Sequence, residues 1–334
     1  IQEVMDDTMA LASDIQANAD VINRIDLLAS FAATALSQRY VRPELTDEPI
    51  LQIEAGRHPV VETLLPATEK FIPNHLSMDA LVNQIHLLTG PNMAGKSTYL
   101  RQNGLIVLMA QIGCFIPAKS GKIGIVDRLF TRVGASDNLA GGESTFLVEM
   151  NEAANILNNA SNRSLILLDE IGRGTATFDG LSIAWAITEY LHQNEDVAAR
   201  TIFATHYHEL TDLEASLERL ENHHVEVKEF GDRIIFLRTI ADGPGDKSYG
   251  IHVAKMAGLP ASIVSRAWEI LHHHVQNAKN KDGTSLPIES SERISLFQEQ
   301  ESRLRKDLNE LDIDSITPLE ALTKLGEIKK EYDL

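Results

Sequence analysis

A glycine-rich loop that ends in a lysine and two hydroxyl residues is the clearest chemical feature of the chain. Residues 90–98 read GPNMAGKST. Consecutive backbone N–H groups of such a loop can wrap a polyphosphate, and the helix that follows directs its positive N-terminal end at the anion. Lys96 would reach the β- and γ-phosphates, and the Ser97 hydroxyl would take a place on Mg²⁺. The residues predicted to bind ATP or GTP are Gly90, Pro91, Asn92, Met93, Ala94, Gly95, Lys96, Ser97 and Thr98.

A pair of carboxylates stands at the end of an apolar run later in the chain. Residues 164–168 read SLILL and are followed by Asp169 and Glu170. In enzymes with a phosphate-binding loop, the first acid at such a strand end holds Mg²⁺, and the second can polarise the attacking water as a general base. A solvated acidic turn is the plain alternative, but the loop earlier in the same expected sheet favours the catalytic interpretation.

A histidine follows the next apolar run. Residues 201–205 read TIFAT and precede His206. A histidine at this point can donate a hydrogen bond to the γ-phosphate and so sense whether ATP is intact. His208 also permits a metal site of the His-x-His type, but no acidic or cysteine cluster completes a ligand set. The three histidines at residues 272–274 face different directions on a helix and cannot converge on one ion. We predict that His206 is the phosphate sensor.

A second anion-binding segment lies between the loop and the carboxylates. Residues 138–146 read NLAGGESTF, in which small residues precede Ser-Thr at an expected helix start. Such a segment exposes backbone donors and two hydroxyls, although a simple capping sequence would look the same. A second phosphate-facing segment cannot easily serve the same site from within one subunit. The sequence therefore predicts two chains packed head to tail, each completing the site of the other.

The elements that must position these residues alternate between strand and helix. Residues 85–89 predict a short apolar strand ahead of the loop, and residues 99–112 a mostly apolar helix behind it. The alternation over residues 85–240 predicts an α/β fold with a largely parallel sheet flanked by helices. Residues 225–228 and 233–238 flank a Gly-Asp turn and predict a hairpin at the sheet edge.

The remainder of the chain reads mostly as helix. Residues 4–35 carry apolar side chains at helical spacing without Pro or Gly, which predicts a long helix or a helix pair. Residues 50–62 mix β-formers with Gly and Pro and predict strands broken by a turn. Two further helices are expected over residues 249–258 and 260–274.

Composition limits the classes of protein to consider. The 334 residues are 43% hydrophobic and 23% charged, which is typical of globular domains. The single cysteine, Cys114, excludes an internal disulfide and is expected inside the helix after the loop, in a reducing compartment such as the cytoplasm. No apolar run approaches the ~20 residues of a membrane span, and nothing at the start resembles a signal peptide. Because the first residue is Ile, we expect a fragment or a processed chain.

The net charge of −18, from 30 basic and 48 acidic residues, bears on the partners of the chain. Neutralisation of phosphates by Lys and Arg supplies most non-specific affinity for DNA. We therefore expect any contact with nucleic acid to lie outside this chain or on a small local patch.

Five blocks of sequence resemble the ATPase domain of the MutS family of DNA mismatch repair proteins. In family order they are GPNMAGKSTYLRQ, SDNLAGGESTFLVEM, LLDEIGRGTATFDG, FATHYHEL and KSYGIHVAKMAGLP. The similarity implies a P-loop NTPase of the ABC ATPase type that hydrolyses ATP with Mg²⁺, with an N-terminal helical segment and C-terminal helices. It also implies a homodimer with two composite ATP sites.

The resemblance also implies roles for single residues. Ser144 would contact the γ-phosphate bound by the partner's loop, and Phe71 falls where the family stacks an aromatic ring on adenine. Arg238 stands where a histidine is common, and its guanidinium could stack on the other side of the base. Ala94 replaces a glycine of the family loop. The catalytic residues would be Lys96, Glu170, His206 and Ser144, and the metal ligands Ser97 and Asp169.

The same resemblance divides the chain into the end of a helical core and lever, an ATPase domain, a helix-turn-helix dimerisation segment, a linker and an acidic helical tail. These segments are residues 1–42, 43–240, 241–276, 277–291 and 292–334. In the tail, residues 317–325 resemble the bacterial repair-type branch of the family. Ile294–Phe297 resembles a sliding-clamp binding peptide, although Arg293 stands where glutamine is usual.

The function implied is ATP binding and hydrolysis coupled to mismatch binding and to sliding-clamp formation on duplex DNA. Upstream domains that we expect to be absent from this chain would contact the DNA, and a MutL-type protein would be a partner. The location would be the bacterial cytoplasm, in association with the nucleoid. A MutS-like paralogue that acts in recombination is one alternative. Another is the nucleotide-binding subunit of an ABC transporter, although that class needs a Leu-Ser-Gly-Gly-Gln-type signature where this chain has Ala-Gly-Gly-Glu-Ser-Thr.

Overall fold

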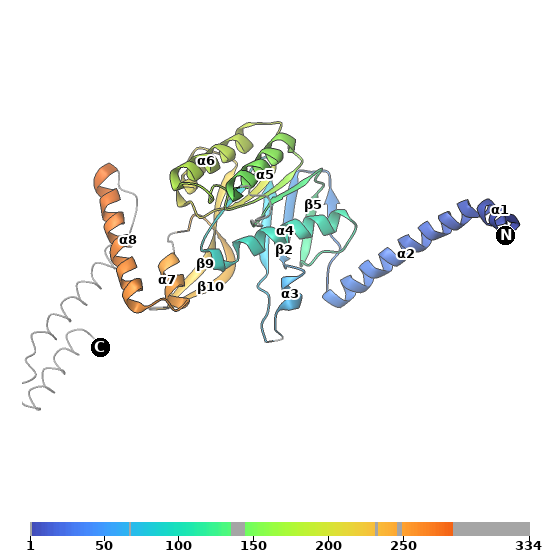
Figure 1. Ribbon diagram of the computed structural model, residues 1–334, viewed down its shortest axis with the longest axis horizontal. Helices are drawn as coiled ribbons and strands as arrows, with labels where there is room; N and C mark the ends of the chain where they lie inside the picture. Colours follow the sequence, from blue (N-terminus) through green and yellow to red (C-terminus); the bar gives the residue numbers. More distant parts are fainter. Residues whose placement is uncertain (1, 67, 135–143, 231–232, 246–248, 283–334) are drawn as a thin grey trace, which may run out of the picture. The chain divides into compact units, whose positions relative to one another are not determined.

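The computed structural model shows a mixed α/β chain (Figure 1). It divides into two compact units, residues 1–253 and residues 254–334. Among the residues that it describes, no helix combines the length and the apolar character needed to span a membrane. The described residues are 2–66, 68–134, 144–230, 233–245 and 249–282.

The larger sheet of the first unit has six strands in the order β10-β9-β4-β8-β7-β6. Every neighbouring pair from β9 to β6 is parallel, and only the β9–β10 pair is antiparallel. The predicted parallel sheet and its edge hairpin are therefore confirmed. The strands are β4 (Ile85–Thr89), β6 (Leu129–Arg132), β7 (Leu165–Asp169), β8 (Arg200–Ala204), β9 (Leu220–Phe230) and β10 (Arg233–Asp242).

Alternate residues of these strands supply two cores, one on each face of the sheet. Leu165 and Leu167 of β7 belong to one cluster, whereas Ile166 and Leu168 belong to the other. Burial on both faces explains why the strands read as unbroken apolar runs rather than as alternating patterns. One helix packs into the first cluster and two into the second, and these are α4 (Lys96–Gln111), α5 (Thr145–Asn159) and α6 (Thr177–Gln193).

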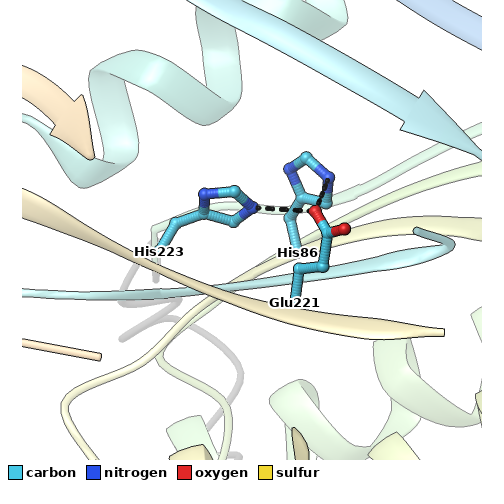
Figure 2. A group of neighbouring side chains, drawn as sticks. All are labelled: His86, Glu221 and His223. Carbon is cyan, nitrogen blue, oxygen red and sulfur yellow. Dashed lines mark ion pairs between the residues drawn. The ribbon is translucent and has the colours of Figure 1, made fainter. Parts of the chain in front are cut away.

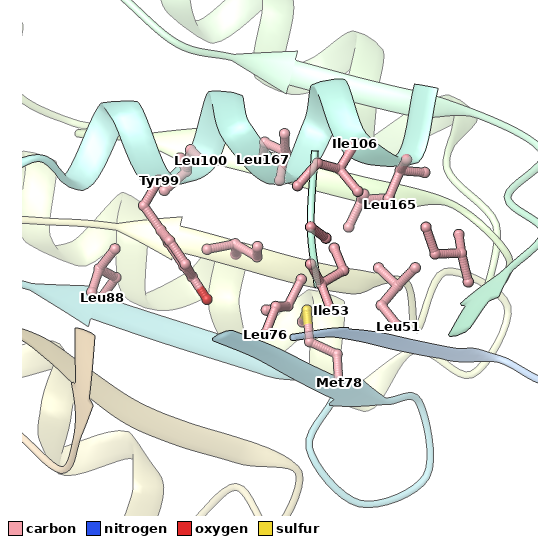
Figure 3. Close-up of a cluster of buried hydrophobic side chains, with 14 of the residues drawn as sticks. Leu51, Ile53, Leu76, Met78, Leu88, Tyr99, Leu100, Ile106, Leu165 and Leu167 are labelled. Atoms are coloured by element: carbon pink, nitrogen blue, oxygen red, sulfur yellow. The ribbon is translucent and has the colours of Figure 1, made fainter. Parts of the chain in front are cut away.

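A smaller sheet of four strands covers the other side of α4. Its order is β1-β5-β2-β3, with β1 parallel to β5 and the other pairs antiparallel. Figure 3 shows Leu51, Ile53, Leu76 and Met78 of this sheet meeting α4 and the larger sheet in one core. The sequence predicted strands near residues 50–62 but not this separate sheet. Its strands are β1 (Glu44–Thr46), β2 (Ile50–Gly56), β3 (Asn74–Asp79) and β5 (Ser120–Gly124).

The helices outside the sheets agree with the sequence in place but not always in length. Residues 4–35, predicted as a helix or a helix pair, fall within α1 and α2, and no residue of α2 is buried. The prediction that Cys114 lies inside a helix is wrong, because α4 ends at Gln111 and Gly113 turns the chain with φ +89°. These two helices and two short ones are α1 (Gln2–Ala10), α2 (Ala12–Gln38), α3 (Val61–Leu64) and η1 (Asn92–Ala94).

Towards the C-terminus, the last described helix is longer than the sequence predicted. The pattern ended it at His274 and placed a linker from residue 277, whereas α8 continues to Asp282, since no Gly or Pro interrupts it before Gly283. The rest of the predicted linker, the acidic tail and Ile294–Phe297 lie outside the described residues. The remaining elements are η2 (His208–Ala215), α7 (Gly250–Met256) and α8 (Ala261–Asp282).

Candidate active site

The loop after β4 has a backbone that requires glycine at two positions. Gly90 has φ +136° and Gly95 has φ +110°, values that side chains disfavour. A Cβ at Gly90 would also come within 3.3 Å of Val225. Gly95 stands at the N-cap of α4, and no side chain caps that helix. The first N–H groups of α4 are therefore available to an anion.

Lys96 directs a buried ammonium group at the inside of this loop. Only 1% of the residue is exposed, and its Nζ donates a hydrogen bond to the carbonyl oxygen of Gly90. Nζ also lies 3.9 Å from Oε1 of Glu170. Burial lowers the pKa of Lys96, while the neighbouring carboxylates of Glu170 and Asp169 act in the opposite direction. The fold thus places a cation where the loop would hold phosphate.

Asp169 ends β7 with one carboxylate oxygen left without a partner. Burial raises the pKa of Asp169, and a hydrogen bond from the Ser97 hydroxyl lowers it in part. The other oxygen, Oδ1, is buried and accepts no hydrogen bond from the residues that the structure describes. A buried acceptor without a donor is costly, and hard divalent cations prefer carboxylate and hydroxyl oxygens. The two residues predicted as Mg²⁺ ligands therefore lie together and fit the ion.

Glu170 occupies a strained backbone conformation next to Asp169. Its φ of +54° is uncommon for a residue with a side chain, and such outliers cost on the order of 1–3 kcal/mol. Its N–H donates to the carbonyl oxygen of Ala204 at 2.8 Å. The carboxylate accepts a hydrogen bond from Arg173 and faces Lys96. These contacts hold the carboxylate at the carboxyl edge of the sheet, beside the loop.

A helix on the other face of the sheet secures the turn that follows Glu170. Oε1 of Glu149, a residue of α5 that is 7% exposed, accepts a hydrogen bond from the Gly172 N–H at 2.5 Å. The Tyr207 hydroxyl donates to the Gly172 carbonyl at 2.9 Å. Gly172 has φ +90°, and a Cβ there would lie 2.5 Å from the carbonyl oxygen of Gly180. The sequence analysis missed Glu149, although it stands one helical turn after Thr145.

Three arginines that the sequence analysis did not select border the same carboxylates. They line a cavity of about 420 Å³ with Ser97, Asp169 and Glu170. Planar guanidinium groups suit the binding of phosphate oxygens. Helical spacing could have indicated the first of them, because it stands four residues after Ser97 on α4. The three are Arg101, Arg132 and Arg173.

The structure brings Phe71 and Arg238 together on the other side of the loop. Both line a cavity of about 310 Å³, together with Met93, Gly95 and Thr98. Arg238 has φ +60° at an irregularity in the pairing of β10 with β9. The Asn74 side chain stabilises the backbone of β10 at this point. It donates to the Arg238 carbonyl and accepts from the Ile240 N–H, both at 2.9 Å. Local sequence gives no signal for this contact, because Asn74 lies on the smaller sheet.

His206 lies at the end of β8, at the carboxyl edge. The residue is exposed, and its ring centre lies 4.2 Å from that of Tyr207. Desolvation lowers the pKa of His206, whereas the charge of Glu170 acts to raise it. The imidazole therefore lies close enough to the Glu170 carboxylate to interact with it electrostatically. The predicted sensor position is thus on the same edge as the loop and the carboxylates.

Ser144 stands apart from both cavities. It is exposed at the N-cap of α5, and its side chain makes no capping hydrogen bond. The sequence argument assigned the whole segment to the site of a partner. Thr145, however, lines the 420 Å³ cavity of its own chain. Residues 138–143 lie outside the described part of the chain.

Comparison with known proteins identifies the family. The family model described as MutS domain V matches residues 86–274, a span that contains the loop, both carboxylates and His206. The chain belongs to the MutS family. This membership confirms the resemblance found in the sequence, and it excludes the ABC transporter subunit.

Several MutS relatives match nearly the whole chain, each named DNA mismatch repair protein MutS. The relative from Parabacteroides distasonis is 52% identical over 325 residues, which cover 95% of this chain and 37% of the relative. The relative from Chlorobaculum tepidum is 54% identical over 323 residues, with 96% and 36% covered. The relative from Thermodesulfovibrio yellowstonii is 53% identical over 332 residues, with 98% and 38% covered. The chain thus spans little more than a third of the length of these relatives.

Proposed function

We propose that this chain is the ATP-binding and ATP-hydrolysing part of a DNA mismatch repair protein. The observation that carries the proposal is the meeting of the 90–98 loop with Asp169 and Glu170 at one edge of a parallel sheet. The relatives are named for mismatch repair, which supports that role over a paralogue that acts in recombination.

The nucleotide would lie along the loop, with its base beside Phe71. The backbone N–H groups of the loop and Lys96 would neutralise the β- and γ-phosphates. Adenine would lie between the aromatic ring of Phe71 and the guanidinium of Arg238. The cavity that these two side chains share with Met93 and Thr98 supports this placement of the base.

Ser97 and Asp169 would hold Mg²⁺, and the buried, unpartnered Oδ1 of Asp169 supports the assignment. Bound there, the ion supplies charge stabilisation to the phosphate oxygens. The guanidinium groups of Arg101 and Arg173 border the same cavity. They would add donors for phosphate oxygens without any change in protonation.

Glu170 would act as the general base. Its carboxylate would accept a proton from the water whose oxygen attacks the γ-phosphorus, and the bond from that phosphorus to the bridging oxygen of ADP would break. His206 would donate a hydrogen bond to a γ-phosphate oxygen. Glu170 pairs with Arg173, so this pair would have to loosen before the carboxylate can meet water.

Two copies would pack head to tail, with Ser144 of each chain contacting the γ-phosphate held by its partner. Residues 241–276 would lock onto the ATPase domain of the other copy. The long helix α2 would carry the nucleotide state to upstream regions that hold mismatched DNA and slide along it as a clamp. A MutL-type protein would recognise that state, and residues 294–297 would bind a sliding clamp. We place the assembly in the bacterial cytoplasm, at the nucleoid.

The test replaces the proposed base and leaves the binding loop intact. Glu170→Gln should bind Mg²⁺-ATP within about threefold of the parent and lose about 10²–10⁴-fold in turnover, the size of a general-base effect. Equilibrium ATP binding and single-turnover hydrolysis measure the two quantities. Glu218→Gln, at an exposed carboxylate just before β9 and so at the opposite edge of the sheet, is the matched control. Hydrolysis by Glu170→Gln at the parent rate would refute the assignment.

A further inference from the structure

Two histidines and a glutamate gather on one face of the larger sheet, away from the proposed ATP site. Glu221 and His223 stand two residues apart on β9, so their side chains point to the same face. β4 runs parallel to β9 with His86 opposite Glu221. The pairing register therefore brings the third side chain to the other two, as Figure 2 shows.

The donor atoms of the three side chains converge on one point. Nε2 of His86 and Nε2 of His223 each lie 3.8 Å from Oε2 of Glu221. All three donor atoms lie within 4.8 Å of one another. Tetrahedral zinc with bonds of about 2.0–2.2 Å holds its ligand atoms roughly 3.4 Å apart. The two nitrogen–carboxylate separations of 3.8 Å would reach that geometry by closing about half an ångström.

The two imidazoles have buried nitrogens that nothing in the described part of the chain satisfies. The His86 side chain is 5% exposed and that of His223 is 12% exposed. Nε2 of each is buried and makes no hydrogen bond. A separation of 3.8 Å from Glu221 is too long for one. A plain hydrogen-bonded network therefore does not account for the cluster.

The surroundings of the rings match those of metal-binding histidines. Nδ1 of His223 lies 3.2 Å from Oδ1 of Asp242, and the backbone of Ser77 interacts with the His86 ring by a hydrogen bond. Such outer contacts orient a ligating imidazole and leave its other nitrogen for the ion. Burial lowers the pKa of both histidines, which favours the neutral form that binds metals.

A cavity of about 480 Å³ opens onto the three side chains. It gives an ion a path from solvent and leaves room for water as a fourth ligand. Two imidazoles with one carboxylate, and one position left to water, is a ligand set that zinc adopts in proteins. Mg²⁺, by contrast, prefers an octahedral shell of oxygens.

We propose that His86, Glu221 and His223 form a Zn²⁺ site that is distinct from the Mg²⁺ site at Ser97 and Asp169. The ion would join β4 to β9. Because β4 leads directly into the phosphate loop, bound Zn²⁺ would fix the strand that carries the loop. The proposal does not depend on the ATPase function.

The test titrates the metal-stripped chain with Zn²⁺ against a chromogenic chelator, with Mg²⁺ in excess to occupy oxygen-only sites. The parent should bind one Zn²⁺ per chain. The variants His223→Ala and Glu221→Gln should each bind Zn²⁺ at least about tenfold more weakly than the parent does. His224→Ala is the matched control, because this residue follows His223 on β9 and faces the other side. His272→Ala controls for the histidines of α8. Both controls should bind as the parent does.

Co²⁺ gives a second readout, since its visible absorption becomes strong when it moves from six-coordinate water to a four-coordinate protein site. The parent and both controls should develop this band, and His223→Ala and Glu221→Gln should lose it. Circular dichroism melts of the metal-free proteins check that each variant folds. If His223→Ala does not fold, Glu221→Gln alone tests the zinc site, because the Glu221 side chain is 43% exposed and its replacement should leave the fold intact. A parent that binds no Zn²⁺, or cluster variants that bind it as well as the parent, would overturn the proposal.

Discussion

At the scale of single residues, the proposed ATP site is built from groups that the fold holds in costly states. Lys96 is a buried ammonium, Asp169 has a buried oxygen without a donor, and Glu170 has a positive φ. Each state lowers the stability of the nucleotide-free chain. A site that binds phosphate and a cation would relieve the first two.

Asp169→Asn should therefore separate stability from activity. The folded chain raises the pKa of Asp169 above its usual 3.8, mainly through burial. The stability contribution of such a group is present below its unfolded pKa and is lost as the pH rises through the folded pKa. At neutral pH the amide avoids this cost. We expect the melting temperature of the nucleotide-free variant to rise by about 1–4 °C, with ATP hydrolysis reduced by at least about 10²-fold.

Melting curves from about pH 4 to about pH 8 provide the control, because the advantage of the variant should grow as the pH rises across that range. A variant that melts below the parent at neutral pH would show that the Asp169 carboxylate does not carry the cost assigned to it.

At the scale of elements, a hydrogen bond accepted by Glu149 ties α5 to the turn that follows β7. Glu149 on this helix accepts from the Gly172 N–H, two residues after Glu170. Glu149→Ala would leave that N–H without an acceptor, whereas Glu149→Gln keeps one. We expect Glu149→Ala to lose about tenfold or more in turnover with little change in ATP affinity. Glu149→Gln should recover most of the rate.

Single-turnover hydrolysis and ATP binding, measured on both variants, distinguish positioning from general instability. Equal losses in the two variants would assign the effect to the charge of Glu149 and its ion pair with Arg132. The hydrogen bond to Gly172 would then have no role in the rate.

The helix α2 should be dispensable for the fold of the two sheets and the helices packed on them. None of its residues is buried, and its end is held where Arg57 donates to the carbonyls of Gln38 and Arg39. Removal of residues 1–34 should change the melting temperature by no more than about 2 °C, the size expected for exposed sites. Removal of residues 1–46, which also takes away β1 and its pairing with β5, should lower it clearly. A large drop with the shorter deletion would contradict the independence of α2.

The sequence was sufficient for the elements whose signal is local. β4 has the predicted bounds, and β7, β8 and the β9–β10 hairpin lie where apolar runs and turn residues indicated. The smaller sheet was missed because its strands pair across long stretches of chain. Glu149 and Asn74 were missed for the same reason, since each acts through contacts with residues distant in sequence. The sequence likewise gives no sign that His86 on β4 lies beside Glu221 and His223 on β9, because this contact depends on how the two strands pair.

At the scale of the whole molecule, the net charge of −18 argues against extended contact between this chain and the phosphates of DNA. The chain spans little more than a third of the length of its relatives. The regions proposed to bind DNA would lie in the rest of that length. In the proposed dimer, Ser144 of one copy completes the site built on Lys96 of the other.

Mixing two inactive variants tests that claim most directly. Lys96→Ala removes the loop cation, and Ser144→Ala removes the hydroxyl offered to the partner, so each variant alone should hydrolyse little ATP. In a mixed dimer, one site combines an intact loop with an intact Ser144. Random pairing of equal amounts should then restore about a quarter of the parent rate. If the mixture hydrolyses ATP no faster than the separate variants do, or if Ser144→Ala alone keeps the parent rate, the composite site is contradicted.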